Sequence, residues 1–192
     1  TRRSSDLFPF VEGARAIGAS PARVLLRHID ERRRPGGPMP PIMQVFETLG
    51  LATVSTSAAD ARRLRFLRPE DGITMNRDRL LGDAKARALA MVDGYRPPEP
   101  PSDLHLPGPT ARVALELALH GHARQGRATV HDRIVGAALA DVLAGGETDI
   151  TVASSEADLL ALERRSFMRL IRDPASIARI EHMLETGKPL RN

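Results

Sequence analysis

A dense run of prolines between residues 96 and 109 constrains the fold of this chain more than any other feature of its sequence. Proline fixes the backbone angle φ and has no N–H group, so neither a helix interior nor a central strand can pass through such a run. The prolines predict an extended, semi-rigid connector over residues 96–108. We therefore expect one structured part before the connector and another after it.

Short helices separated by breakers are predicted before the connector. The predicted helices cover residues 7–17, 21–34 and 41–49, a segment that Ser57 is placed to cap, and residues 76–92. Adjacent arginines followed by proline and glycine predict a loop over residues 32–38. We interpret residues 1–42 as a diverged or inserted helical segment and residues 43–95 as a second helical segment.

The part after the connector is predicted to be a helical bundle over residues 109–192. Its predicted helices cover residues 109–122, 130–144, 156–171 and 174–186. Thr129 with Asp132 and Ser155 with Asp158 have the spacing of capping boxes, and Asp173 precedes a proline at a helix start. Short strands are predicted at residues 51–54 and 150–152.

The composition favours helices that pack through aliphatic side chains. Aromatic residues make up 3% of the chain, with no Trp and one Tyr, so the core must be mostly aliphatic. Apolar residues recur at helical spacing, for example at Val130, Ile134, Ala138 and Val142, and again at Leu160, Phe167 and Ile171. The predicted fold class is mainly α, with two helical parts joined by the proline-rich connector.

The chain has no cysteine, which excludes disulfides, zinc–thiolate sites and thiol catalysis. A reducing cytoplasm is therefore the expected location. No apolar run approaches the roughly 18 residues of a membrane-spanning helix, so no membrane span is expected. The chain begins with Thr1 rather than Met, as expected of a fragment, a processed product or an incomplete reading frame.

The charged residues predict a mixed surface with a small positive surplus. The net charge is +4, from 28 basic and 24 acidic residues that are interspersed along the chain. Nucleic acid is not the expected partner, because aromatic stacking platforms are scarce and the helix-turn-helix, RRM and zinc-finger patterns are not recognisable. One alternative stays open: a stand-alone helical interaction module that binds an acidic protein or nucleic acid through an arginine-rich surface. A surface without an arginine stripe would argue against that alternative.

No residue is assigned a catalytic or metal-binding role from these patterns. His131 and Asp132 open a predicted helix, where a carboxylate is favoured as a cap, so we interpret the pair as structural. Glu163, Arg164 and Arg165 fit the exposed face of an amphipathic helix. The sequence has neither GxGxxG after a strand nor GxxxxGK[ST], so it carries no phosphate-binding loop of these kinds.

Several motifs, in order along the chain, resemble bacterial fatty-acid oxidation proteins. These proteins join an NAD-dependent 3-hydroxyacyl-CoA dehydrogenase to a C-terminal enoyl-CoA hydratase of the crotonase superfamily. The resemblance covers roughly residues 43–192. The motifs are residues 54–61 (VSTSAADA), 83–85 (DAK), 94–98 (GYRPP), 131–132 (HD), 162–167 (LERRSF) and 179–192 (RIEHMLETGKPLRN).

The resemblance implies that this chain is the C-terminal helical region of the crotonase part, without its β-spiral core. It implies catalytic glutamates upstream of the chain, so no catalytic residue is carried over and the chain is expected to be inactive alone. Whether the chain is itself an enzyme stays open. In the complete enzyme a CoA thioester would be the substrate and NAD a cofactor, and Lys188 and Arg191 are candidate contacts for the CoA phosphates.

The same resemblance implies partners: acyl-CoA through the complete enzyme, the upstream crotonase core and dehydrogenase domains, and a possible homo-oligomer. It has two departures. Residues 1–42 match the family poorly and are rich in Arg and Pro, and Arg65 stands where crotonases commonly have glycine after a helix. A left-handed backbone there would cost a non-glycine residue about 1 kcal/mol, so the helix is expected to end in another way. A truncated or inactive gene product with exposed apolar helices is a third possibility.

Overall fold

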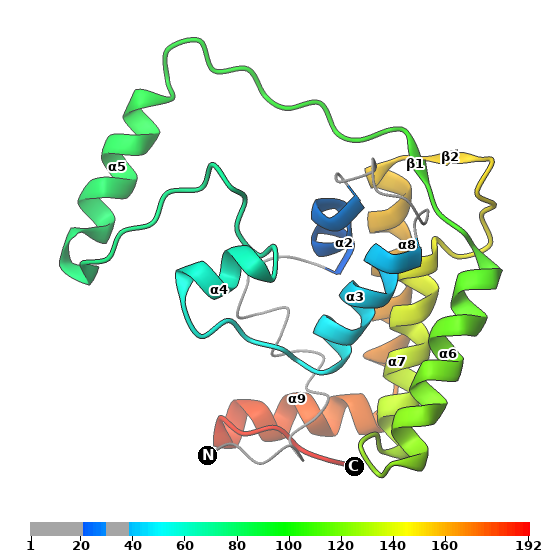
Figure 1. The fold of residues 1–192 in the computed structure, drawn as a ribbon. Helices are drawn as coiled ribbons and strands as arrows, with labels where there is room; N and C mark the ends of the chain where they lie inside the picture. The colour runs from blue at the N-terminus through cyan, green and yellow to red at the C-terminus, as the bar shows by residue number, and fades with distance from the viewer. Residues whose placement is uncertain (1–20, 30–38) are drawn as a thin grey trace.

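The computed structural model describes residues 21–29 and 39–192, and the described part consists of helices with one short strand pairing (Figure 1). This confirms the prediction of a mainly α fold. The predicted helix over residues 7–17, the end of the predicted helix over residues 21–34, and the loop over residues 32–38 lie outside the described residues.

Helices α2 (Pro21–Ile29), α3 (Met39–Gly50) and α4 (Ala58–Arg63) precede the connector. Helix α3 begins before the predicted residue 41. Pro40 and Pro41 stand in its first turn, where backbone N–H groups have no acceptor within the helix, so proline is tolerated there. Ser57 caps α4 as predicted, with its hydroxyl accepting a hydrogen bond from the Asp60 N–H. The Asp60 carboxylate accepts from the N–H of Thr56 rather than from the cap itself.

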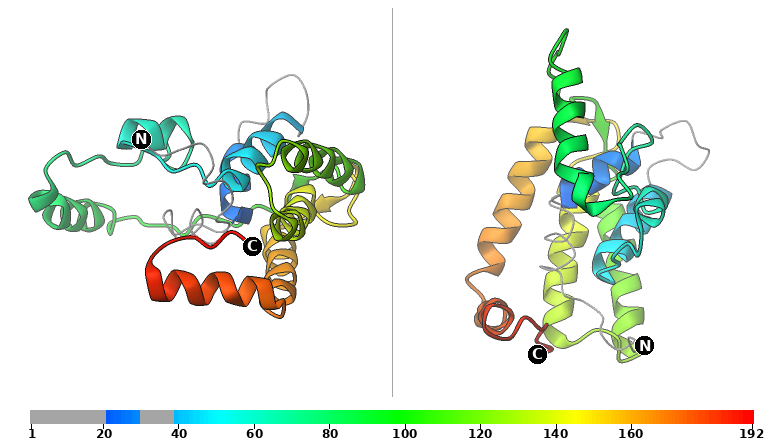
Figure 2. Two further views of the ribbon diagram at one scale, coloured as in Figure 1. Left: turned by 90° about the horizontal axis from the view of Figure 1, so that it is seen from below. Right: turned by 90° about the vertical axis from the view of Figure 1, so that its left-hand side faces the viewer.

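Four longer helices follow the connector and confirm the helices predicted there to within two residues. They are α6 (Pro109–Arg124), α7 (Val130–Ala144), α8 (Glu156–Leu170) and α9 (Pro174–Thr186). Capping boxes at Thr129 and Ser155 open α7 and α8, and Asp173 caps α9, all as predicted. Helices α6, α7 and α8 run side by side, while α9 turns away steeply across one end of α7 (Figures 1 and 2).

One main hydrophobic core joins elements from both sides of the proline-rich segment. Its largest buried side chain is Phe46 of α3, surrounded by aliphatic residues of α2, α3, α6, α7 and α8. Helix α7 is central, since it contacts α2, α3, α6 and α8. Helices α6 and α7 approach closely at Gly136, where an added Cβ would lie 2.7 Å from Leu119 Cδ2. The domain boundaries at residues 42, 95 and 108 stay a prediction.

The predicted strands are wrong in position. Residues 51–52 form a turn, in which the Leu51 N–H returns to the Glu47 carbonyl and continues the end of α3, and residues 53–54 are irregular. The strands that form are β1 (Leu104–His105) and β2 (Ala153–Ser154), which pair antiparallel. Strand β1 falls inside the predicted connector, and Leu104 and Leu106 are buried. The exposed, extended segment therefore ends at residue 103.

The apolar stripe predicted on α7 is half wrong. Ala138 and Val142 are buried, but Val130 is 78% exposed and Ile134 is 47% exposed. Positions four residues apart rotate by about 40° around an α-helix, so such a stripe drifts from one face to another over three turns. The face that α7 buries instead includes Val135, Leu139 and Leu143.

Residues 68–103 form an excursion that we call the arm. It holds the 3₁₀ turn η1 (Arg77–Arg79) and helix α5 (Leu80–Ala90), which together confirm the helix predicted over residues 76–92. No residue of the arm is buried, and Figure 1 shows α5 standing apart on two extended segments. The fold therefore leaves one whole helix without a partner among the described residues.

The segment that leads into the arm leaves α4 through a left-handed residue. Arg65 has φ of 60°, so the expectation that this helix would end in another way is wrong. The left-handed turn brings the N–H of Phe66 to the Ala61 carbonyl at 2.8 Å. Phe66 then packs with Ala61 and Leu64 in a small separate cluster. That packing accounts for a conformation that arginine rarely adopts.

Candidate functional site

A buried polar cluster joins the start of α7 to α9. We call it the anchor, and it consists of Thr129, His131, Asp132, Ser176 and Arg179. His131 Nε2 lies 3.0 Å from Ser176 Oγ, and both side chains are buried. Arg179 Nη1 lies 2.8 Å from Asp132 Oδ1. Three of its members, His131, Asp132 and Ser176, are buried polar residues.

Ser176, His131 and Asp173 have the residue types of a hydrolytic triad but not its geometry. His131 Nδ1 lies 3.8 Å from Asp173 Oδ1, beyond hydrogen-bonding distance. That oxygen already accepts a hydrogen bond from the Ala175 N–H, as the cap of α9. Ser176 is only 8% exposed, so a substrate has no access to its hydroxyl. The cluster holds two helices together and is not a nucleophilic site.

The surroundings of His131 favour its neutral form. Burial lowers the pKa of the imidazole, and the charge of Arg179 lowers it further, while Asp173 and Asp132 oppose the shift. The predicted cap role is confirmed for Asp132, whose carboxylate accepts from the Thr129 N–H at 2.7 Å. No sequence pattern indicated that Asp132 also pairs with Arg179, because the two residues lie on different helices.

The last residue of the chain is bound to the same arginine. Arg179 Nε donates to the Asn192 side-chain oxygen at 2.7 Å, and the Asn192 amide nitrogen donates to the Ala175 carbonyl at 3.0 Å. Lys188 and Arg191, the candidate contacts for CoA phosphates, lie in this tail with their side chains exposed. The tail is thus held at Asn192 while its cations face solvent.

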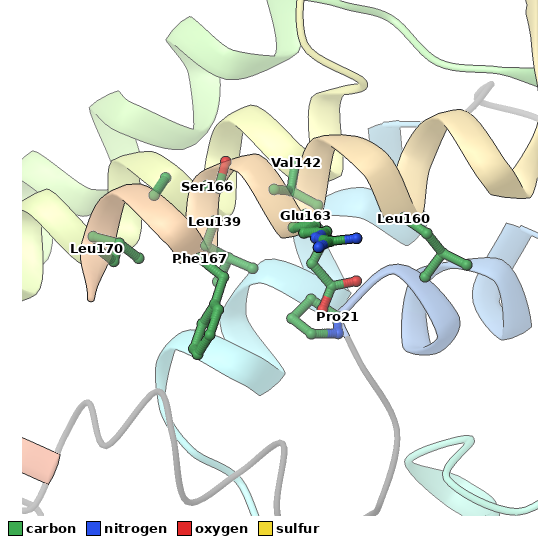
Figure 3. Close-up of a pocket in the computed structure, with 10 residues that line it drawn as sticks. Pro21, Leu139, Val142, Leu160, Glu163, Ser166, Phe167 and Leu170 are labelled. Carbon is green, nitrogen blue, oxygen red and sulfur yellow. The ribbon is translucent and has the colours of Figure 1, made fainter. Parts of the chain in front are cut away.

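An apolar groove lies between α7 and α8 and has a volume of about 320 Å³ (Figure 3). We call it the α7–α8 groove. Its walls are almost wholly carbon. The lining residues are Pro21, Ala138, Leu139, Val142, Leu160, Glu163, Arg164, Ser166, Phe167 and Leu170. Leu160 and Phe167, from the apolar stripe predicted on α8, line the groove. The residues of α7 that form its other wall could not be predicted from the sequence, because they meet α8 only in the folded protein.

Glu163 is the carboxylate in this lining, and it faces the start of α2. Its Oε2 accepts from the Ala22 N–H at 3.4 Å, a favourable position for a negative charge at a helix N-terminus. Figure 3 shows Glu163 beside Pro21. The Glu163 carboxylate therefore joins α8 to the start of α2 at the groove.

Four arginines lie on or just after α8: Arg164, which lines the groove, and Arg165, Arg169 and Arg172, which do not. All four are exposed, and none forms an ion pair within residues 21–29 and 39–192. Arg165 and Arg169 of α8, with Arg172 just past the end of the helix, are spaced as one stripe on the side of α8 that faces away from the groove. The prediction that residues 163–165 fit an exposed helix face is confirmed for Arg164 and Arg165, while Glu163 is half-buried.

The described part of the chain holds no group of three or more side chains placed to bind a metal ion. None of its helices is both long and apolar enough to cross a membrane.

Comparison with known proteins gives one informative similarity. The chain is 40% identical over 166 residues to a protein described as probable 3-hydroxyacyl-CoA dehydrogenase, from Bacillus subtilis strain 168. The match covers 86% of this chain but 21% of the relative, so the chain spans about a fifth of that protein. No protein-family model and no solved structure matches. The chain is therefore related in sequence to one segment of a probable 3-hydroxyacyl-CoA dehydrogenase.

Proposed function

We propose that this chain is the C-terminal helical part of a multifunctional fatty-acid β-oxidation enzyme, which couples enoyl-CoA hydration to NAD-dependent oxidation of 3-hydroxyacyl-CoA. The observation that carries the proposal is the 40% identity over 166 residues to the Bacillus subtilis protein. In this proposal the chain supports assembly and the acyl-CoA pocket and has no turnover alone. The catalytic groups belong to an upstream crotonase core and upstream dehydrogenase domains.

The arm supports a role in assembly. Leu81 and Met91 lie with Ala84 and Ala88 on one side of α5 and form an apolar face. This face is uncovered among the described residues, since Leu81 is 82% exposed and Met91 is 51% exposed. Exposed apolar side chains on one helix face are a common mark of a protein contact. We propose that the upstream crotonase core covers this face of α5 in the complete enzyme.

Reconstitution in trans tests the proposal. The Bacillus subtilis relative is prepared without the segment that this chain matches, and the purified chain is added to it. We expect the chain alone neither to hydrate crotonyl-CoA nor to oxidise a 3-hydroxyacyl-CoA with NAD, and we expect it to restore activity lost from the shortened relative. A shortened relative that stays inactive with the chain added, while the intact relative is active, would contradict the proposal.

A pair of α5 variants makes this test specific. Leu81→Asp adds a charge to the apolar side of α5, and the matched control Ala86→Asp adds one to the opposite side. Both positions are exposed, so both variants should fold. We expect Leu81→Asp to weaken reconstitution and Ala86→Asp to leave it intact. Equal effects would show that this face is not the contact.

Lys188 and Arg191 are the proposed contacts for CoA phosphates, because both are exposed cations in a tail whose last residue is held in place. Titration calorimetry with CoA tests this role. The double variant Lys188→Glu with Arg191→Glu should weaken CoA binding, since it reverses both charges. Lys85→Glu, on the arm, is the matched control and should bind CoA as the wild type does.

The arginine stripe of α8 favours one other function, a stand-alone module that binds an acidic protein or nucleic acid. Arg165, Arg169 and Arg172 are exposed and form no ion pair in the described part of the chain. Binding of duplex DNA at several salt concentrations tests this alternative, because each phosphate contact adds about one unit to the salt dependence. Tight, salt-sensitive binding that Arg169→Glu abolishes would favour it over the enzyme role.

A further inference from the structure

We infer that residues 7–17 of this chain dock lengthwise in the α7–α8 groove as an amphipathic helix. These residues lie outside the described part of the chain, so their sequence and the geometry of the groove together carry the inference. It goes beyond the proposed function and does not depend on it. The groove then serves as a packing surface for the chain's own N-terminal part.

The sequence of residues 7–17 has the apolar pattern of one helix face. Apolar residues recur there at the spacing i, i+3, i+4, i+7 and i+10: Leu7, Phe10, Val11, Ala14 and Ile17. Isolated helices shorter than about 12–15 residues are marginal in water, and Gly13 lowers the helix propensity of this segment further. A helix over residues 7–17 therefore needs a surface to pack against.

The groove matches such a helix in length and in character. Its α8 wall runs from Leu160 to Leu170, ten residues apart, which is about 15 Å along a helix axis. Leu7 and Ile17 are also ten residues apart, so a helix between them has the same length. Phe167 of this wall is 51% exposed, and a docked helix would cover the apolar surface that its ring now presents.

The described part of the chain begins at the groove itself. Pro21, the first residue of α2, belongs to the lining, and Figure 3 shows it beside Glu163. The Glu163 carboxylate accepts a hydrogen bond from the Ala22 N–H, which fixes this start of α2 against α8. The four-residue step from Ile17 to Pro21 reaches at most about 14 Å. Residues 7–17 are therefore confined to the neighbourhood of the groove.

Covalent attachment favours this segment over a separate occupant. A short tether gives an attached segment an effective concentration on the order of 1 mM at its site. Below a chain concentration of that order, a second copy of the chain occupies the groove only if its contact is much tighter. A protein partner competes under the same condition. The apolar segment beside the groove is therefore its favoured occupant.

Hydrogen exchange of the full 192-residue chain, followed by mass spectrometry, tests the inference. The reference is a synthetic peptide of residues 1–20, which has the same segment without the groove. Amides of a docked helix exchange slowly, because the helix must open before they meet solvent. We expect the amides of residues 7–17 to exchange at least about tenfold more slowly in the chain than in the peptide.

Two matched pairs of variants locate the contact. Ala14→Asp places a charge on the apolar side of the segment, and Ala16→Asp places the same charge on the opposite side. Phe167→Asp places a charge in the groove wall, and Met168→Asp is its control on the next residue, outside the lining. These two side chains are 51% and 41% exposed, so neither change empties the core. Circular dichroism verifies that all four variants fold.

The docked helix is supported if Ala14→Asp and Phe167→Asp both remove the protection of residues 7–17. The two control variants should retain it. Equal exchange in the chain and in the peptide overturns the inference. Protection that Phe167→Asp leaves intact places the segment elsewhere and also overturns it.

A second copy of the chain is identified as the occupant by a different result. In that case Phe167→Asp dissociates a dimer, while residues 7–17 exchange as they do in the peptide, and the inference is overturned. Reconstitution in trans tests the proposed function alone. Failed reconstitution with intact protection of residues 7–17 would therefore count against that function and not against the docked helix.

Discussion

Arg179 of α9 and Asp132 of α7 form an ion pair in which Asp132 is 1% exposed and the Arg179 side chain 13% exposed. The aspartate also caps α7, and the arginine also binds Asn192, so one pair fixes a helix start, a second helix and the end of the chain. Such a buried pair contributes little if both members are replaced, but loss of one member leaves a charge buried and unpaired.

Asp132→Asn should therefore destabilise the protein by about 3–5 kcal/mol. Urea unfolding followed by circular dichroism measures the change. Asp158→Asn is the matched control, because Asp158 occupies the same capping-box position in α8 without a buried ion pair. The control should lose far less stability. Similar losses for both variants would show that the cap alone, and not the pair with Arg179, accounts for the effect.

Stability should fall as the solution becomes mildly acidic, because His131 has a lowered pKa in the folded protein. Below its ordinary value of about 6.5, the unfolded chain binds a proton at this imidazole before the folded chain does. Protonation therefore favours unfolding as the pH drops from 6.5 toward the lower folded-state pKa. Urea midpoints measured across that interval should decrease.

The variant His131→Gln should lose this part of the pH dependence, since glutamine does not titrate. His120→Gln is the control, because His120 is exposed on α6 and should keep the wild-type profile. If wild type and His131→Gln have parallel profiles, the imidazole does not govern the acid sensitivity.

Arg65→Gly should stabilise the protein by up to about 1 kcal/mol, because glycine adopts a left-handed backbone without steric cost. Arg65 holds φ of 60° at the end of α4. Thermal or urea unfolding checks the gain. The comparison variant Arg133→Gly lies within α7 and should lose about 1 kcal/mol through helix propensity. A loss at Arg65→Gly would mean that contacts of the arginine side chain outweigh the strain.

Two glycine-to-alanine changes, at the start of α6 and within it, should change the stability of the protein in opposite directions. Gly108 caps the helix with φ of 62°, and an added Cβ would lie 1.8 Å from the Thr148 carbonyl oxygen. Gly108→Ala should therefore destabilise the protein by more than 1 kcal/mol. Gly121 lies within the helix with no atom near an added Cβ, so Gly121→Ala should gain up to about 1 kcal/mol. Unfolding midpoints of the two proteins should move in opposite directions.

The features that could be predicted from the sequence are those that neighbouring residues determine. Thr129 with Asp132 and Asp173 with Pro174 marked the starts of α7 and α9, because a cap and its partner lie within one turn. The two-residue strands β1 and β2 were misplaced because so short a segment has no measurable alternation. Their pairing links residues far apart in the chain.

The candidate sites were less predictable than the helices. Arg179 lies 47 residues after Asp132, and nothing in either local pattern indicates their ion pair. The α7–α8 groove likewise needs Leu139 and Phe167 on facing helices, together with Pro21 from the other side of the proline-rich segment. At Arg65 the backbone preference of a non-glycine residue predicted that the left-handed conformation would be avoided. The residue adopts it nevertheless, because Phe66 then packs in a small apolar cluster.

Because no residue of the arm is buried, the core holds together without any contact from the arm. Leu25 and Phe46 share a core with Leu106 and Leu143, although the arm divides them in sequence. A protease that cleaves the arm should therefore release no half of the protein, and residues before and after the cut should stay together in one folded particle. An intact backbone through residues 68–103 is therefore not required to keep the core folded.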